Sequence, residues 1–236
     1  MSSTDTLSTL DTLVLAKDTD WDYLSPIFQD AIGETLYMAL WGLVGGGLAG
    51  LVIGVLLYTT RKGGVLANRP TFWILNVLVN IVRPVPFIIL LTALGPLTKV
   101  VVGSILGLNA ATFAIIIAAA FGAARIVEQN LVSIDPGVIE AARAMGASPL
   151  RIIFTVIIPE ALGPLILGAT FMFIAIVDMS AMAGYVGAGG LGDFAIQYGY
   201  RAFDNNVTYV TLVVIIVIVQ IAQLFGNWLA RRIMRR

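Results

Sequence analysis

The feature that most restricts the fold of this chain is the run of residues 36–58, which contains no Asp, Glu, Lys or Arg. A helix needs about 20 apolar residues to cross the hydrocarbon core of a bilayer, and this run is long enough. Four further runs of similar length carry at most one charge each: 71–94 with Arg83, 100–124, 162–186 with Asp178, and 207–230. Backbone in lipid must satisfy its own hydrogen bonds, so each run should be helical. We therefore predict an all-α polytopic membrane protein with five transmembrane helices.

The composition excludes several classes of protein. Charged residues make up 12% of the chain, about half the ~25% of ordinary soluble domains, so a cytosolic enzyme is disfavoured. Without Cys and His, the chain has no disulfide, no thiolate or imidazole metal site and no cysteine nucleophile. None of Lys17, Lys62 and Lys99 is followed by Ser or Thr, so the phosphate-binding loop of ATPases is missing. With a net charge of zero, no nucleic-acid partner is expected.

The distribution of basic residues predicts the orientation. With the C-terminus inside, ten of them are cytoplasmic: Arg61, Lys62, Arg69, Arg125, Arg143, Arg151, Arg231, Arg232, Arg235 and Arg236. Only Lys17, Lys99 and Arg201 then lie outside. Five spans place the N-terminus outside, so residues 1–30, rich in Ser, Thr and Asp, are expected to form a polar extracytoplasmic tail before a membrane domain at 31–236.

The longest cytoplasmic segment predicts a helix, a glycine turn and a second helix. Asp135 followed by Pro136 is a typical helix start, and Gly146 is suited to the left-handed conformation that ends a helix. These signals predict a helix over 136–145. Ser148 with Pro149 repeats the start signal, and Pro159 should stop or bend the second helix.

A helix of about ten residues is too short to be stable alone in water, so it needs a surface to pack on. Val138, Ile139 and Met145, beside Glu140 and Arg143, form a short apolar surface that suits insertion into a groove on a partner. An amphipathic linker lying on the membrane or on the protein's own helices explains the same pattern. The pattern alone leaves both interpretations open.

One motif in this segment resembles a known family. Glu140-Ala141-Ala142, three residues, Gly146, nine residues, then Val156, Ile158 and Pro159 resembles the EAA loop of ABC-importer permeases. The resemblance implies that residues 135–159 form a coupling loop held by a separate ATPase subunit, which binds the ATP and Mg. Its expected contact residues are Glu140, Ala141, Ala142, Arg143, Met145 and Gly146.

The resemblance extends over roughly 31–236. Residues 83–91 resemble the R-S-x-P-x-x-x-L-L segment of amino-acid permeases, with Pro84 at the usual small residue. Residues 179–182, 186–192 and 197–200 are similar to those of the methionine-uptake permeases, which have the type I fold. The resemblance implies a homodimeric, non-catalytic permease in the cytoplasmic membrane, fed with methionine by an extracytoplasmic binding protein. Alternatives are a permease for another amino acid or small peptide, an ion-coupled carrier that uses Asp178, and a non-transporting scaffold.

Three residues are candidates for the transport path. Arg83 and Asp178 are charges inside spans, where each costs a few kcal/mol unless it faces protein or water. They are expected to pair with each other, or Arg83 to extend toward the surface, and the third possibility is contact with an amino acid in transit. Met182 is a gate candidate by resemblance, and packing is its alternative role.

Two glycine patterns complete the prediction. Gly42, Gly46, Gly50 and Gly54 repeat every four residues, which favours close helix packing over a lining of the path. Residues 187–192 match G-x-G-x-x-G, but they follow a membrane span and not a strand. We interpret them as a sharp external turn.

Overall fold

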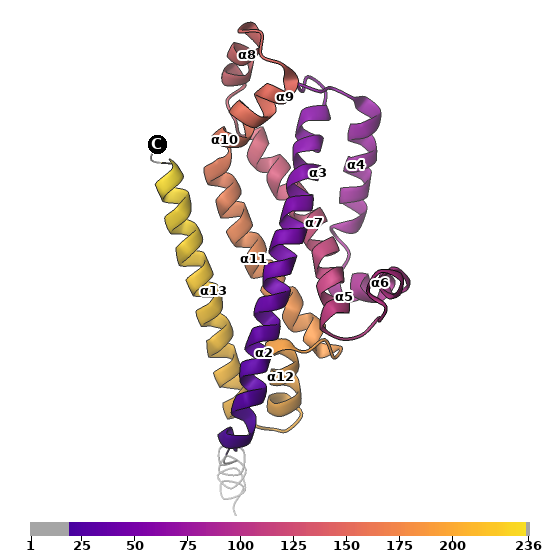
Figure 1. Cartoon of the computed structure of the whole chain (residues 1–236), viewed down its shortest axis with the longest axis vertical. Helices are drawn as coiled ribbons and strands as arrows, with labels where there is room; N and C mark the ends of the chain where they lie inside the picture. The colour runs from indigo at the N-terminus through magenta and orange to yellow at the C-terminus, as the bar shows by residue number, and fades with distance from the viewer. Residues whose placement is uncertain (1–18, 235–236) are drawn as a thin grey trace, which may run out of the picture.

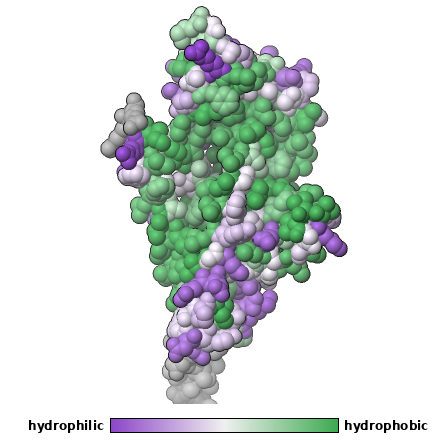
Figure 2. All heavy atoms as spheres, viewed as in Figure 1, coloured by the Kyte–Doolittle hydropathy of each residue, from purple (hydrophilic) through white to green (hydrophobic). Residues whose placement is uncertain are grey.

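The computed structural model describes residues 19–234, and in this part of the chain every regular element is a helix. Long helices run side by side along the molecule, and short helices close its two ends (Figure 1). We call these the α8 end and the α12 end. Polar residues gather at both ends and apolar residues cover the surface between them (Figure 2). Among the described residues, four helices are long and apolar enough to cross a membrane, or five if one bent pair is a single span.

The first span is longer than predicted. α2 (Trp21–Trp41), the π-helical segment η1 (Gly42–Gly46) and α3 (Gly47–Thr60) form one 40-residue helix, about 60 Å long at 1.5 Å per residue. Residues 21–30, expected in the polar tail, are therefore helical, and residues 1–18 lie outside the described part. Asp20 caps this start by accepting a hydrogen bond from the Tyr23 N–H.

The predicted span 71–94 is broken. α4 (Arg69–Val82) and α5 (Phe87–Ala93) meet at 109°. Pro84 and Pro86 lie in the break, where proline removes N–H donors that a continuous helix requires.

The predicted span 100–124 is displaced along the chain. A short helix, α6 (Gly95–Val102), ends at Gly103, which has φ +87°. The long helix α7 (Leu108–Val132) begins after Gly107, at φ +90°. Both glycines have backbone conformations that L-residues rarely adopt. They therefore divide the predicted span 100–124 between two helices, α6 and α7. Arg125 and Glu128 consequently lie inside α7 and not in the following loop.

The last two predicted spans coincide with the long helices α11 (Leu162–Tyr185) and α13 (Asn205–Met234). Between them lie α12 (Gly190–Phe194) and the π-helical segment η3 (Ala195–Tyr200). The segment before α11 contains α8 (Pro136–Ala144), α9 (Pro149–Ile152), the π-helical η2 (Ile153–Ile157) and α10 (Ile158–Glu160).

The glycine repeat of the first span packs against α7. A Cβ on Gly50 would overlap that of Ala123, and one on Gly54 would lie 2.6 Å from the Ala124 carbonyl oxygen. A third glycine of the repeat, Gly46, is equally close to Ala119. The helix contact expected from the spacing is confirmed.

Gly50→Ala should therefore destabilise the fold, by about 1–3 kcal/mol, because the added methyl group forces α3 and α7 apart. The matched control is Gly47→Ala, since a Cβ there has no neighbour within 4 Å. Thermal unfolding of the purified protein in detergent measures the difference. Equal unfolding temperatures for the two variants would contradict this account of the contact.

Candidate functional site

α8 begins and ends as the sequence predicts. The Asp135 carboxylate accepts a hydrogen bond from the Gly137 N–H at 2.8 Å, and Pro136 occupies the first helical position. At the other end Gly146 has φ +77°, and its N–H donates to the Arg143 carbonyl at 2.9 Å. The Ala147 N–H donates to the Ala142 carbonyl at 3.2 Å, which completes a glycine-terminated helix end.

The second helical stretch begins at Ser148, whose hydroxyl accepts from the Arg151 N–H at 3.4 Å. It continues through α9, η2 and α10, and ends at Glu160, directly after Pro159. The predicted stop near this proline is confirmed. Since α11 starts at Leu162, the loop connects to this long helix almost without a break.

One face of α8 packs on the chain itself. Ala142 is 3% exposed and belongs to a cluster with Tyr58 of α3, Leu131 of α7 and Ile152 of α9. Ile139 packs against the same cluster. The second alanine of the motif therefore anchors α8 on the ends of two long helices.

Four large apolar side chains of this segment are exposed. Met145 is 81% exposed, and Val138, Leu150 and Phe154 are exposed as well. We call these four residues the coupling surface. Glu140, Ala141 and Gly146 are also accessible. Exposed apolar side chains gathered at one tip are typical of a surface that meets a partner.

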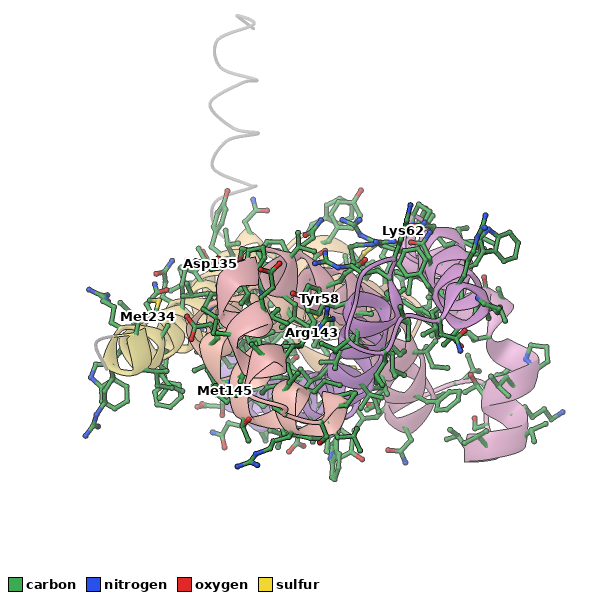
Figure 3. The ribbon with its side chains drawn as sticks, turned by 90° about the horizontal axis from the view of Figure 1, so that it is seen from above. Tyr58, Lys62, Asp135, Arg143, Met145 and Met234 are labelled. Carbon is green, nitrogen blue, oxygen red and sulfur yellow. The ribbon has the colours of Figure 1, made fainter. Side chains whose placement is uncertain are left out.

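Arg143 does not point the same way as Met145. In the view onto the α8 end, Arg143 extends toward Tyr58 and Met145 away from it (Figure 3). The Arg143 guanidinium donates to the Gly63 carbonyl at 3.3 Å, beside a cavity of about 100 Å³ that Tyr58 and Glu140 also line. Arg143 therefore ties α8 to the loop after α3, a contact that the sequence pattern did not indicate.

A second polar cluster, also missed from the sequence, joins α4 to α7. Arg125 pairs with Glu128 at 2.5 Å, and it donates to the side-chain oxygens of Asn76 at 3.0 Å and Asn80 at 2.5 Å. The side chains of the ion pair are 16% and 12% exposed. The i,i+3 spacing of Arg125 and Glu128 and the i,i+4 spacing of the asparagines were the available signals.

The candidate path residues are not brought together within one chain. Arg83, at the break between α4 and α5, and Asp178 of α11 are both exposed, and within residues 19–234 neither side chain has a hydrogen bond or an ion pair. The expected pairing is wrong for the single chain. Met182, also on α11, is 37% exposed. The opposite charges of Arg83 and Asp178 thus lie in the apolar part of the molecule, where water, substrate or a second copy of the chain can contact them.

A cavity of about 530 Å³ lies between the first helix, α7 and α11. Its lining is apolar and includes Leu48, Ile126, Leu165 and Met172. Zwitterions need polar partners when they leave water, so this cavity does not suit a free amino acid.

Comparison with known proteins decides the family. The family model described as "Binding-protein-dependent transport system inner membrane component" matches residues 29–235. The chain belongs to this permease family. It is therefore a multi-pass membrane protein.

Individual relatives of this permease cover nearly its full length. It is 45% identical over 210 residues to the "Probable D-methionine transport system permease protein MetI" of Vibrio cholerae, covering 89% of this chain and 93% of that one. It is 43% identical over 207 residues to the "Methionine import system permease protein MetP" of Bacillus subtilis, covering 88% and 93%.

Among solved structures, the permease resembles a chain of the inward-facing MetNI methionine ABC transporter, with a TM-score of 0.87 and 41% identity over 89% of this chain and 97% of that one. The all-helical fold expected from the resemblance is confirmed.

Proposed function

We propose that this permease carries methionine across the cytoplasmic membrane as the translocation subunit of an ABC importer. The observation that carries the proposal is the identity above 40%, over 88–89% of the chain, to permeases named for methionine transport. The anchored, apolar coupling surface supports it, because such a tip suits a separate motor subunit. Two copies form the transporter, each binds one ATPase, and a binding protein delivers methionine from outside.

The α8 end faces the cytoplasm and the α12 end faces the exterior. This orientation is supported by the basic residues: without Arg125, which lies within α7, it places nine of them inside against three outside. Arg61 and Lys62 follow α3, and Arg231 and Arg232 end α13, so the basic residues of both helices lie at the α8 end.

The coupling surface moves as a unit when the ATPases close. Shifting a two-state equilibrium from 1:99 to 99:1 requires about 5.5 kcal/mol, whereas one exposed ion pair supplies about 0–1 kcal/mol. Glu140 or Arg143 alone is therefore insufficient. Because Ala142 packs on the ends of α3 and α7, a displacement of α8 acts directly on both long helices.

The path runs between two copies, where Arg83 and Asp178 face water. Their opposite charges suit the carboxylate and ammonium groups of an amino acid, and their exposure in the single chain supports this role. Met182 is the gate, since its flexible thioether fills an irregular opening.

Uptake of labelled methionine by vesicles that contain the permease and its ATPase tests the proposal. We expect ATP-dependent uptake when methionine-loaded binding protein is present, and no uptake without ATP. The control is an ATPase variant that binds ATP but does not hydrolyse it. Uptake that persists without ATP and collapses with an ion gradient would instead favour an ion-coupled carrier working through Asp178, whose charge has no partner within residues 19–234.

A further inference from the structure

Two neighbouring side chains of α2 hold the start of α12, although they lie 156 residues away in sequence. The Glu34 carboxylate accepts a hydrogen bond from the Gly190 N–H at 2.6 Å. The Thr35 hydroxyl accepts one from the Leu191 N–H at 2.8 Å, and Thr35 is 2% exposed. Both acceptors therefore come from one turn of the first long helix.

This contact differs from the helix starts that are capped by a side chain of their own. α4, α8 and α9 are capped locally by Asn68, Asp135 and Ser148, the residue before each helix. α12 has Gly189 in that position and no side-chain cap of its own. Free N–H groups at a helix start need acceptors, so the order of α12 depends on where α2 lies.

The backbone of the turn before α12 lies directly against side chains of α2. Gly189 and Gly190 have φ +83° and +81°. A Cβ on Gly190 would lie 2.8 Å from the Thr35 hydroxyl oxygen and 2.9 Å from the Met38 methyl carbon, and one on Gly189 would overlap the Glu34 carboxylate. Glycine is required here both for conformation and for close approach.

The other side of α12 rests on α11 beside the candidate gate. A Cβ on Gly192 would lie 2.5 Å from the Ala181 Cα, and one on Gly184 would lie 2.9 Å from the Gly192 carbonyl carbon. Ala181 immediately precedes Met182. α12 thus lies between α2 and the last turns of α11, in contact with both.

We propose that Glu34 and Thr35 are positioning residues that clamp α12 against α11 and hold Met182 in the closed position. The first helix extends from this clamp to Tyr58, which packs beneath α8. Movement of α8 therefore reaches the clamp through one continuous helix, and release of the clamp frees the turn beside Met182. The inference rests on the proposed function for the role of Met182 as gate.

The chain contains no cysteine, so a single Met182→Cys reporter can be labelled without background. The probe is a membrane-impermeant maleimide added outside vesicles that hold the permease–ATPase complex, without nucleotide and without methionine. Thr35→Val removes the acceptor at constant shape, and Thr35→Ser retains it. Glu34→Ala and Glu34→Gln form a second matched pair at a less buried position.

We expect labelling to accelerate about five- to a hundredfold in Thr35→Val and Glu34→Ala, the range for losing the partner of a buried N–H. Thr35→Ser and Glu34→Gln should label like the parent. Equal labelling rates in all four variants would overturn the clamp. Equal acceleration in the conservative and the disruptive variants would do the same. So would a parent protein whose Met182→Cys reporter already reacts as fast as a free thiol. Because labelling needs neither methionine nor ATP, failure to transport methionine leaves this result readable.

Discussion

Gly146→Val is expected to abolish ATP-driven transport while leaving the permease inserted in the membrane. Gly146 has φ +77°, a conformation that a β-branched residue adopts only with strain. A Cβ at this position has no neighbour within 4 Å, so the defect comes from the backbone and not from a clash. The turn that ends α8 must then change, and the coupling surface loses its shape. Co-purification of the ATPase and uptake in vesicles measure both consequences.

The matched control for this variant is Gly146→Asn, because asparagine tolerates the left-handed conformation better than other non-glycine residues. We expect it to retain most of the bound ATPase and most of the transport. Normal assembly and uptake by the valine variant would remove the proposed role of this turn. A loss of equal size in both variants would also count against it, since the two differ chiefly in their tolerance of positive φ.

Arg125→Met should destabilise the permease by about 3–5 kcal/mol, the cost of leaving a buried charge without its partner. Glu128 is 9% exposed, and Arg125 is its only ion-pair partner within residues 19–234. The variant also removes the hydrogen bonds that Asn76 and Asn80 accept from the guanidinium. Unfolding of the purified protein in detergent, followed by denaturant or temperature, measures the loss.

The double variant Arg125→Met, Glu128→Gln provides the decisive comparison. With both charges removed, much of the stability should return, because replacing a buried pair costs far less than breaking it. Arg151→Met serves as the surface control, since Arg151 is exposed and such changes usually stay within about 0.5 kcal/mol. A double variant as unstable as the single one would show that the guanidinium contacts to α4, and not the unpaired carboxylate, determine the effect.

The sequence predicts best where local signals decide the structure. Asp135, Pro136 and Gly146 each act on their own backbone, so the bounds of α8 agree with the prediction within one residue. The last two spans follow from apolar runs that carry at most one charge between clear ends. The glycine repeat predicted a close helix contact, but not that α7 is its partner.

The sequence predicts less well where hydropathy has no local boundary. Residues 100–107 are apolar enough to join the following helix, yet Gly103 and Gly107 separate them through backbone conformation. Residues 21–30 continue the first helix and do not form a separate tail. The clamp by Glu34 and the pairing of Arg125 with Asn76 depend on which helices become neighbours, which no single segment specifies.

The π-helical segment Gly42–Gly46 divides the first helix into two arms of unequal length. From this pivot, Tyr58 lies about 18 Å along one arm and Glu34 about 12 Å along the other, at 1.5 Å per residue. A tilt that swings Tyr58 by about 3 Å therefore swings Glu34 by about 2 Å the opposite way, in the proportion of the two arms. That displacement is enough to separate a carboxylate oxygen and an amide nitrogen that are 2.6 Å apart. In the importer that we propose, the helix would act as a lever: a push on α8 would be converted into the loss of one hydrogen bond at α12.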